Sequence, residues 1–238
     1  MEVFMSESHK KLGEVGWDEI DVATQGEGGK SNDSIFLNMS KEGNYKIRVV
    51  SRPYQYYCHW VETKSGKRRK VNATLDGTDP ICLQENKGPQ LKWLLKVLYR
   101  DPQKGTQLKV LDAGTQIMAQ IQRLHKDKEN FGNVSKYDII LTRGPKNARP
   151  LYTVQATGSE KFAQPMTTEE VQMVKDSGNP DSKGCFVNIE KMCEPWSAQR
   201  IMSVINEEDP SKAKEKVSVE EPLLDDQNDD KDFLDLDV

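Results

Sequence analysis

"NYKIRVVSRPYQYYCHWVETKSGKRRK", residues 44–70, is the stretch from which a fold can first be predicted. From Tyr45 to Val50 apolar side chains alternate with a mostly basic set, which is the period of a strand with one core face and one wetter, basic face. Pro53 then ends or bends this strand. Residues 56–63, "YYCHWVET", predict a second strand, and "KSGKRRK" follows as a turn that carries five basic residues. The stretch therefore predicts a basic hairpin.

A second basic hairpin is predicted further along the chain. Residues 137–142, "YDIILT", and residues 151–157, "LYTVQAT", are rich in β-branched and aromatic side chains. The loop between them, "RGPKNARP", carries three more cations. Together the two hairpins predict a mainly β protein of the α+β class, with a five-stranded, barrel-like core and added helices.

Four helices are predicted around this core. Leucines at positions 91, 94, 95 and 98 have helical spacing and predict a short helix before "DPQKG". Thr115 is a candidate cap for a second helix with apolar residues on one side, although this segment is also compatible with a strand. A capping box from Thr167 to Glu170 predicts a third helix that ends near Gly178. Residues 196–205 predict the last one.

The two ends of the chain are predicted to lie outside the core. Residues 1–33 are polar and contain a glycine-rich run, which indicates a flexible arm, and residues 34–206 form the expected core. Residues 207–238 are predicted to be a disordered acidic tail, because their like charges repel and little apolar area is available for burial. Whether Trp17 in the arm mediates self-association stays open.

Charge is distributed very unevenly over these parts. Residues 41–152 hold 22 lysines and arginines against 10 aspartates and glutamates, a formal charge of +12. Residues 220–238 hold nine acidic residues and one lysine, a charge of -8. A basic body is where an anionic partner is expected to bind.

No catalytic or cofactor motif is recognisable, so an enzyme is not expected. The start of the chain has no secretory pattern and no apolar run spans a membrane, and four scattered cysteines fit reduced thiols in a cytoplasm. Cys58, His59 and Cys82 are candidate zinc ligands, but there is no C-x-x-C pair, and Cys58 and His59 would point to opposite faces of a strand. The prediction is therefore no metal and no cofactor, with buried thiols instead.

Binding of single-stranded nucleic acid asks for cations that track phosphates and for exposed rings on which bases stack. The two hairpins supply both. Alternation along a strand divides the rings between two faces, so only one set is expected to reach solvent, and the sequence does not say which. The candidate contacts are Arg48, Arg52, Tyr54, Tyr56, Tyr57, Trp60, Lys64, Lys67, Arg68, Arg69, Lys70, Arg143, Lys146 and Arg149.

Three segments and the acidic tail resemble the helix-destabilising single-stranded DNA-binding proteins of tailed bacteriophages, the T-even type and its more distant relatives. The segments are "NYKIRVVSRPYQYYCHWVE", "DPICLQENKG" and "FGNVSKYDIILTRGPKNARPLYTVQA". The resemblance implies an oligonucleotide/oligosaccharide-binding (OB) barrel that acts in DNA replication, recombination and repair in the cytoplasm of an infected bacterium. T-even members carry a zinc site with closely spaced cysteines, and this chain departs from it, because Asp79 stands where a paired cysteine would be needed.

The resemblance also implies that the tail recruits replication or recombination proteins and competes with DNA for the basic surface. The expected partner-binding residues are Asp229, Asp230, Asp232, Phe233, Leu234, Asp235, Leu236 and Asp237. A merely solubilising tail is the alternative. For the whole protein the alternatives are an RNA-binding module of the same barrel class, a metal-dependent nuclease with dispersed carboxylates, and a structural protein that binds other proteins through its basic face.

Overall fold

The computed structural model describes residues 13–14, 35–85, 87–182 and 186–207 of the chain. The strands are β1 (Gly13–Glu14), β2 (Gly43–Val49), β3 (Tyr54–Glu62), β4 (Arg68–Asn72), β5 (Gln90–Asp101), β6 (Gly105–Ala113), β7 (Ile139–Arg143) and β8 (Tyr152–Ala156). The helices are α1 (Pro80–Glu85), α2 (Thr115–Lys126), α3 (Thr168–Gly178), α4 (Ile189–Cys193) and α5 (Ala198–Asn206), with short 3₁₀ turns η2 (Val134–Lys136) and η3 (Glu160–Phe162). The predicted β-rich α+β class is confirmed.

All strands of the described residues belong to one antiparallel sheet. Its neighbours follow the order β1-β3-β5-β2-β7-β8, with β4 added to β3 and β6 added to β5. No pairing among the described strands joins β8 back to the opposite edge, so the sheet stays open there, and a closed five-stranded barrel is not what these pairings show. Both predicted hairpins are present, as β3–β4 and β7–β8.

The strand β5 is the centre of this sheet, and the prediction of a helix at its leucines is wrong. One edge of β5 pairs with β6 along nine residue pairs, and the other edge pairs with β3 and then with β2. Trp93 and Leu95 face one hydrophobic cluster while Leu94 faces another, so both faces of the strand are buried. A strand that is apolar on both faces loses the period of two, and its leucines can then imitate helical spacing.

The strands β2 and β3 follow each other along the same edge of β5. Ile47 pairs with Tyr99 and Val49 with Val97, whereas Tyr54 pairs with Leu94, so the register shifts across residues 50–53. The break is held by the Lys96 backbone N–H, which donates to Ser51 Oγ at 2.8 Å. The sequence prediction that Pro53 ends or bends this strand is confirmed.

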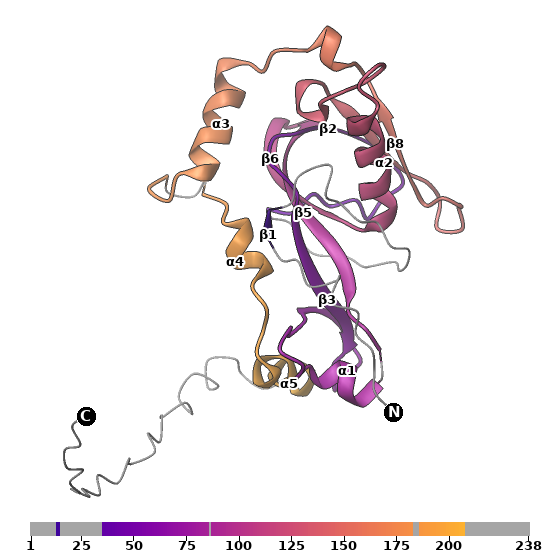
Figure 1. Ribbon diagram of the computed structural model, residues 1–238, viewed down its shortest axis with the longest axis vertical. Helices are drawn as coiled ribbons and strands as arrows, with labels where there is room; N and C mark the ends of the chain where they lie inside the picture. The colour runs from indigo at the N-terminus through magenta and orange to yellow at the C-terminus, as the bar shows by residue number, and fades with distance from the viewer. Residues whose placement is uncertain (1–12, 15–34, 86, 183–185, 208–238) are drawn as a thin grey trace, which may run out of the picture.

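The helix α2 fills the concave side of the sheet. Its buried residues include Ile117, Ile121 and Leu124, the side predicted to be apolar, and they join the larger hydrophobic cluster. Gly114, rather than Thr115, occupies the N-cap position. Figure 1 shows α2 inside the curve that β2, β6 and β8 make, while β3 extends away from it toward α1 and α5.

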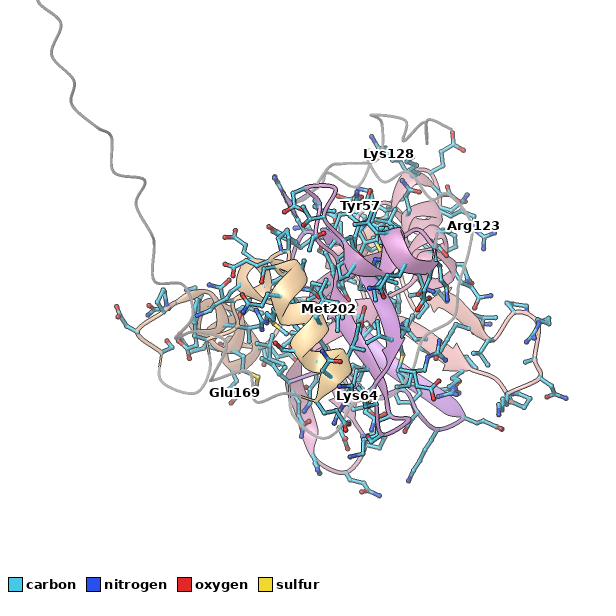
Figure 2. The ribbon with its side chains drawn as sticks, turned by 90° about the horizontal axis from the view of Figure 1, so that it is seen from below. Tyr57, Lys64, Arg123, Lys128, Glu169 and Met202 are labelled. Carbon is cyan, nitrogen blue, oxygen red and sulfur yellow. The ribbon has the colours of Figure 1, made fainter. Side chains whose placement is uncertain are left out.

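The last three helices run along one side of the molecule, from the α2 end to the far end of β3 (Figure 1). The predicted capping box of α3 is confirmed, since Thr167 accepts from the Glu170 N–H and the Glu170 side chain accepts from the Thr167 N–H. The helix α5 packs through Ile201 on Val61, Val71 and Ile81. Figure 2 shows Lys64 beside one end of α5, where its N–H donates to the carbonyl of Ile205 at 2.9 Å.

The ends of the chain are described only in part. Within residues 1–33, predicted as a flexible arm, Gly13–Glu14 forms β1 and pairs with β3 at Gln55 and Tyr54. The rest of that arm and the acidic tail beyond residue 207 lie outside the described residues. In the described part, each helix is too short or too polar to cross a lipid bilayer.

Arg48, a predicted DNA contact, is instead part of the protein core. Its side chain is 2% exposed, and its Nε donates to Asp138 Oδ1 at 2.8 Å. Arg100 binds the other oxygen of the same carboxylate at 3.3 Å and also pairs with Glu170 of α3. Burial alone would raise the pKa of Asp138, but Arg100 and Arg48 hold that pKa below its ordinary value. The basic face predicted for β2 is therefore an internal ion network at this position.

We predict that Asp138→Asn lowers the free energy of unfolding by about 3 to 5 kcal/mol, because it leaves Arg48 buried without a counter-charge. Urea denaturation at pH 7 measures this loss, with Asp181→Asn, at an exposed position, as the control. Since the folded state lowers the pKa of Asp138, its stabilisation is complete above the unfolded value of about 4 and is lost as the pH falls further. The difference between the variant and the natural chain must therefore shrink in acid. A loss below 1 kcal/mol at pH 7 would contradict the prediction.

Candidate nucleic-acid interface

A groove of about 430 Å³ lies where the two basic hairpins approach each other. One wall is the β3–β4 hairpin, another is the segment 36–40, and the third is the loop end of the β7–β8 hairpin, at Arg143 and Tyr152. Arg143 of β7 donates to the backbone carbonyl of Met39, which ties the second and third walls together. The lining residues are Phe36, Leu37, Asn38, Met39, Ser40, Trp60, Arg68, Arg69, Lys70, Lys92, Asp112, Arg143 and Tyr152.

Rings and cations alternate around this groove. Arg68 and Lys92 lie 5.3 and 5.8 Å from the centre of the Trp60 ring. Lys70 lies 5.6 Å from the ring of Phe36, and Arg143 lies 5.9 Å from that of Tyr152. Five of the lining residues are cationic and one, Asp112, is anionic, so the groove has a positive potential. The hollow therefore holds three aromatic rings, each with a cation over it, together with cations that can pair with phosphates.

Asp112 is the anionic group of this lining. Its Oδ2 accepts from Lys70 Nζ at 2.6 Å and its Oδ1 accepts from the Tyr56 hydroxyl at 2.9 Å. Lys92 Nζ lies 3.7 Å from Oδ1. Burial by itself would raise the pKa of Asp112, but the charges of Lys70 and Lys92 and the hydrogen bonds keep it lowered. Asp112 is therefore ionised at neutral pH.

The structure divides the predicted rings of β3. Tyr56 is 1% exposed and Tyr57 is 9% exposed, so both belong to the core and neither can stack on a base. Tyr54, together with Arg52, lines a second hollow of about 390 Å³ between the β2–β3 connection and the α3–α4 segment. Of the four predicted rings, Trp60 alone lines the groove. Tyr56 faces the same side of β3 as Trp60, but its hydroxyl is taken by Asp112 and Lys70.

The predicted cations are divided in the same way. Arg68, Arg69, Lys70 and Arg143 line the groove, and Arg48 is buried away from it. Lys64 and Lys67 are exposed at the turn of the first hairpin, and Lys146 and Arg149 are exposed in the loop of the second. These four lie outside the lining and extend its positive surface.

Eight lining residues were not predicted from the sequence, and four of these carry a ring or a charge. Tyr152 pairs across the hairpin with Arg143, a relation that the hairpin prediction already implied. Lys92 was hidden because its segment was predicted as a helix, whereas in β5 it pairs with Tyr56 and shares its face. Phe36 and Asp112 carried no local signal, since their positions follow from strand pairing alone.

The structure brings His59 and Cys82 together, with Asp79 in place of Cys58. The donor atoms of these three lie within 4.8 Å of one another, and Nε2 of His59 is 3.2 Å from Asp79 Oδ2. Cys58 belongs to a hydrophobic cluster, and burial raises the pKa of its thiol to about 11. The expected separation of Cys58 from His59 is thus observed.

This cluster does not fit a structural zinc ion. It offers three donors within the described residues, whereas structural zinc sites take four. Asp79 is also already occupied, because it precedes Pro80 at the start of α1 and accepts from the backbone N–H groups of Ile81, Cys82 and Thr74. Burial lowers the pKa of His59 although Asp79 opposes the shift, so a neutral ring donates to the carboxylate. The absence of a metal stays a prediction.

Comparison of the chain with protein-family models gives no match, and comparisons with the curated proteins and with the solved structures give none either. The resemblance to phage proteins therefore stays a prediction that rests on the quoted segments.

We predict that Asp79→Ala lowers the free energy of unfolding by about 2 to 4 kcal/mol, because it removes a helix cap and leaves a buried N–H of Thr74 and the ring of His59 without an acceptor. Cys82→Ser, a conservative change in the same cluster, should lower the free energy of unfolding by less than about 1 kcal/mol. Urea denaturation with and without a chelator measures both. Equal costs for the two variants, or destabilisation by the chelator, would instead indicate a bound metal.

Proposed function

We propose that this protein binds single-stranded DNA in the groove, without sequence preference and without catalysis. The observation that carries the proposal is the alternation of Trp60, Phe36 and Tyr152 with five cations in one hollow. Stacking on an aromatic ring contributes about 1 to 3 kcal/mol per base and tolerates every base, since each has a π face. Cations along the same groove neutralise phosphates, which adds affinity that does not depend on sequence.

Binding of this kind also removes secondary structure from DNA. A groove that accepts unpaired bases on its rings binds the open strand and not the duplex, so mass action shifts the equilibrium toward the open strand. We therefore place the protein in phage DNA replication, recombination and repair, as its resemblance implies. We also propose that the curved sheet around α2 is an OB-type barrel, a fold that commonly binds single strands.

The acidic tail follows Glu207, which lies at the turn of the β3–β4 hairpin, and this position fits the proposal. Glu207, the last described residue, accepts hydrogen bonds from Thr63 and Ser65 in the turn of the β3–β4 hairpin. The charges of Lys67 and Arg69 help to lower the pKa of Glu207, after its hydrogen bonds with those two hydroxyls. A tail tethered there is at high effective concentration near the groove, so it can compete with DNA or, when displaced, present its apolar residues to partner proteins.

We predict that Trp60→Leu weakens binding to poly-dT by about tenfold, since one stacked base is lost. Fluorescence titration across a salt series measures the effect, and Phe162→Leu, at a ring that is 80% exposed on η3, is the control.

Arg69→Gln should reduce the salt dependence of the logarithm of affinity by about 0.7 if it removes one phosphate contact. Lys128→Gln, at an exposed lysine after α2 (Figure 2), should leave the salt dependence unchanged.

The same titration tests the alternatives. Salt-insensitive or undetectable binding of poly-dT would contradict the proposal and favour a protein-binding role for the basic face. Preference for poly-U over poly-dT would indicate an RNA-binding module. Shortening of labelled DNA with magnesium or manganese would indicate a nuclease.

We predict that truncation after Val219 tightens DNA binding, most clearly at low salt, because it removes a segment of charge -8 from beside the groove. A full-length variant with Phe233, Leu234 and Leu236 changed to serine keeps that charge and serves as the control. It should bind DNA like the natural chain. Equal affinity of the truncated and natural chains at low salt would show that the tail does not compete.

A further inference from the structure

The floor of the groove contains two lysines that share one carboxylate. Lys92 has a side chain that is 8% exposed, and within the described residues its recorded charged partner is Asp112, 3.7 Å away. Lys70 is 25% exposed and donates to Asp112 Oδ2 at 2.6 Å. The three groups together leave one positive charge in excess at the bottom of a hollow that also holds Arg68 and Arg69.

A lysine as buried as Lys92 needs a counter-charge, because desolvation penalises the ammonium form. In the free protein Asp112 supplies that charge to both lysines at once. A DNA phosphate that enters the groove is a second anion for the same ammonium groups. The carboxylate and the phosphate repel each other and compete for the same ammonium groups. A lysine that is paired with Asp112 therefore interacts less strongly with DNA.

The hydrogen bonds of Asp112 allow such an exchange. The Tyr56 hydroxyl donates to Asp112 Oδ1 at 2.9 Å and accepts from Lys70 Nζ at 2.8 Å. When Lys70 turns toward a phosphate, Tyr56 remains as a donor to the carboxylate, and Lys92 remains beside it. Asp112 thus keeps partners while the more exposed of the two lysines is released.

We propose that Asp112 is an internal counter-ion of the groove, which holds Lys70 and Lys92 in place in the free protein and limits the affinity for the DNA backbone. This inference rests on the proposed function. It assigns to Asp112 a restraining role at the site, so that its removal strengthens binding and does not weaken it. Such a restraint favours release of the strand, because the lysines regain a partner as the phosphate leaves.

The decisive variant is Asp112→Asn, which keeps the size of the side chain and an oxygen acceptor for Tyr56. Fluorescence titration with poly-dT should show about tenfold tighter binding at low salt, equivalent to about 1.4 kcal/mol. The salt dependence of the logarithm of affinity should become steeper by about 0.7, the value for one additional phosphate contact on a single strand. Glu169→Gln makes the same change of net charge at an exposed position of α3 (Figure 2), a helix with no residue in the groove lining, and should alter affinity less than twofold.

A second variant tests whether the lysine that Asp112 releases binds a phosphate. Lys70→Gln should weaken binding and reduce the salt dependence by about 0.7, and it remains informative if Asp112→Asn does not fold. An unchanged salt dependence in Lys70→Gln would overturn the inference. So would an Asp112→Asn variant that has the natural circular dichroism spectrum but binds DNA equally or more weakly. In both cases salt-sensitive binding by the natural chain would leave the proposed function standing, whereas its absence would remove both.

Discussion

Backbone pairing on both edges of β5 is the constraint on which the rest of the structure depends. Its twelve residues meet β6 along one edge and β3 followed by β2 along the other. Since β4 is attached to β3 and β7 is attached to β2, this one strand fixes the distance between the two basic hairpins. The groove exists because hairpins far apart in the sequence are held on neighbouring parts of one sheet.

Two ion networks on this sheet differ in solvent exposure, and this difference separates a structural role from a role in ligand binding. In the first, Arg48 and Asp138 are 2% and 4% exposed, and the same carboxylate is also bound by Arg100, which is 20% exposed, and by the exposed Lys46. In the second, Lys70 and Asp112 are 25% and 22% exposed and open into the groove. The buried Arg48–Asp138 pair contributes to stability and specificity of the fold, whereas a pair that opens into a groove can exchange a partner with a ligand. Similar residues therefore have different roles.

Local patterns in the sequence predicted most of the elements but not their arrangement. The two hairpins and the capping box at Thr167 follow from turn and cap residues, which act over a few positions. The strand β5 was missed because burial on both faces removes the alternation that marks a strand. Alternation places Tyr54, Tyr56 and Trp60 on one face of β3, but Tyr54 lines the second hollow, Tyr56 is buried and Trp60 lines the groove, because their surroundings depend on elements packed from elsewhere in the chain. Asp112 could not be found at all, because its role comes from partners 42 and 56 positions away.

The hairpin that forms one wall of the groove is itself held by the helix that leads into the acidic tail. Lys64 donates its N–H to Ile205 at the end of α5, and Thr63 and Ser65 donate to Glu207. Ile201 of α5 packs on Val61 of the same hairpin, so the contact has an apolar part as well. Any force on the tail therefore acts first on the turn that presents Lys67 and Arg69. In the proposed function, displacement of the tail and adjustment of this hairpin are thus coupled through direct contacts, in addition to competition of charge between the tail and DNA.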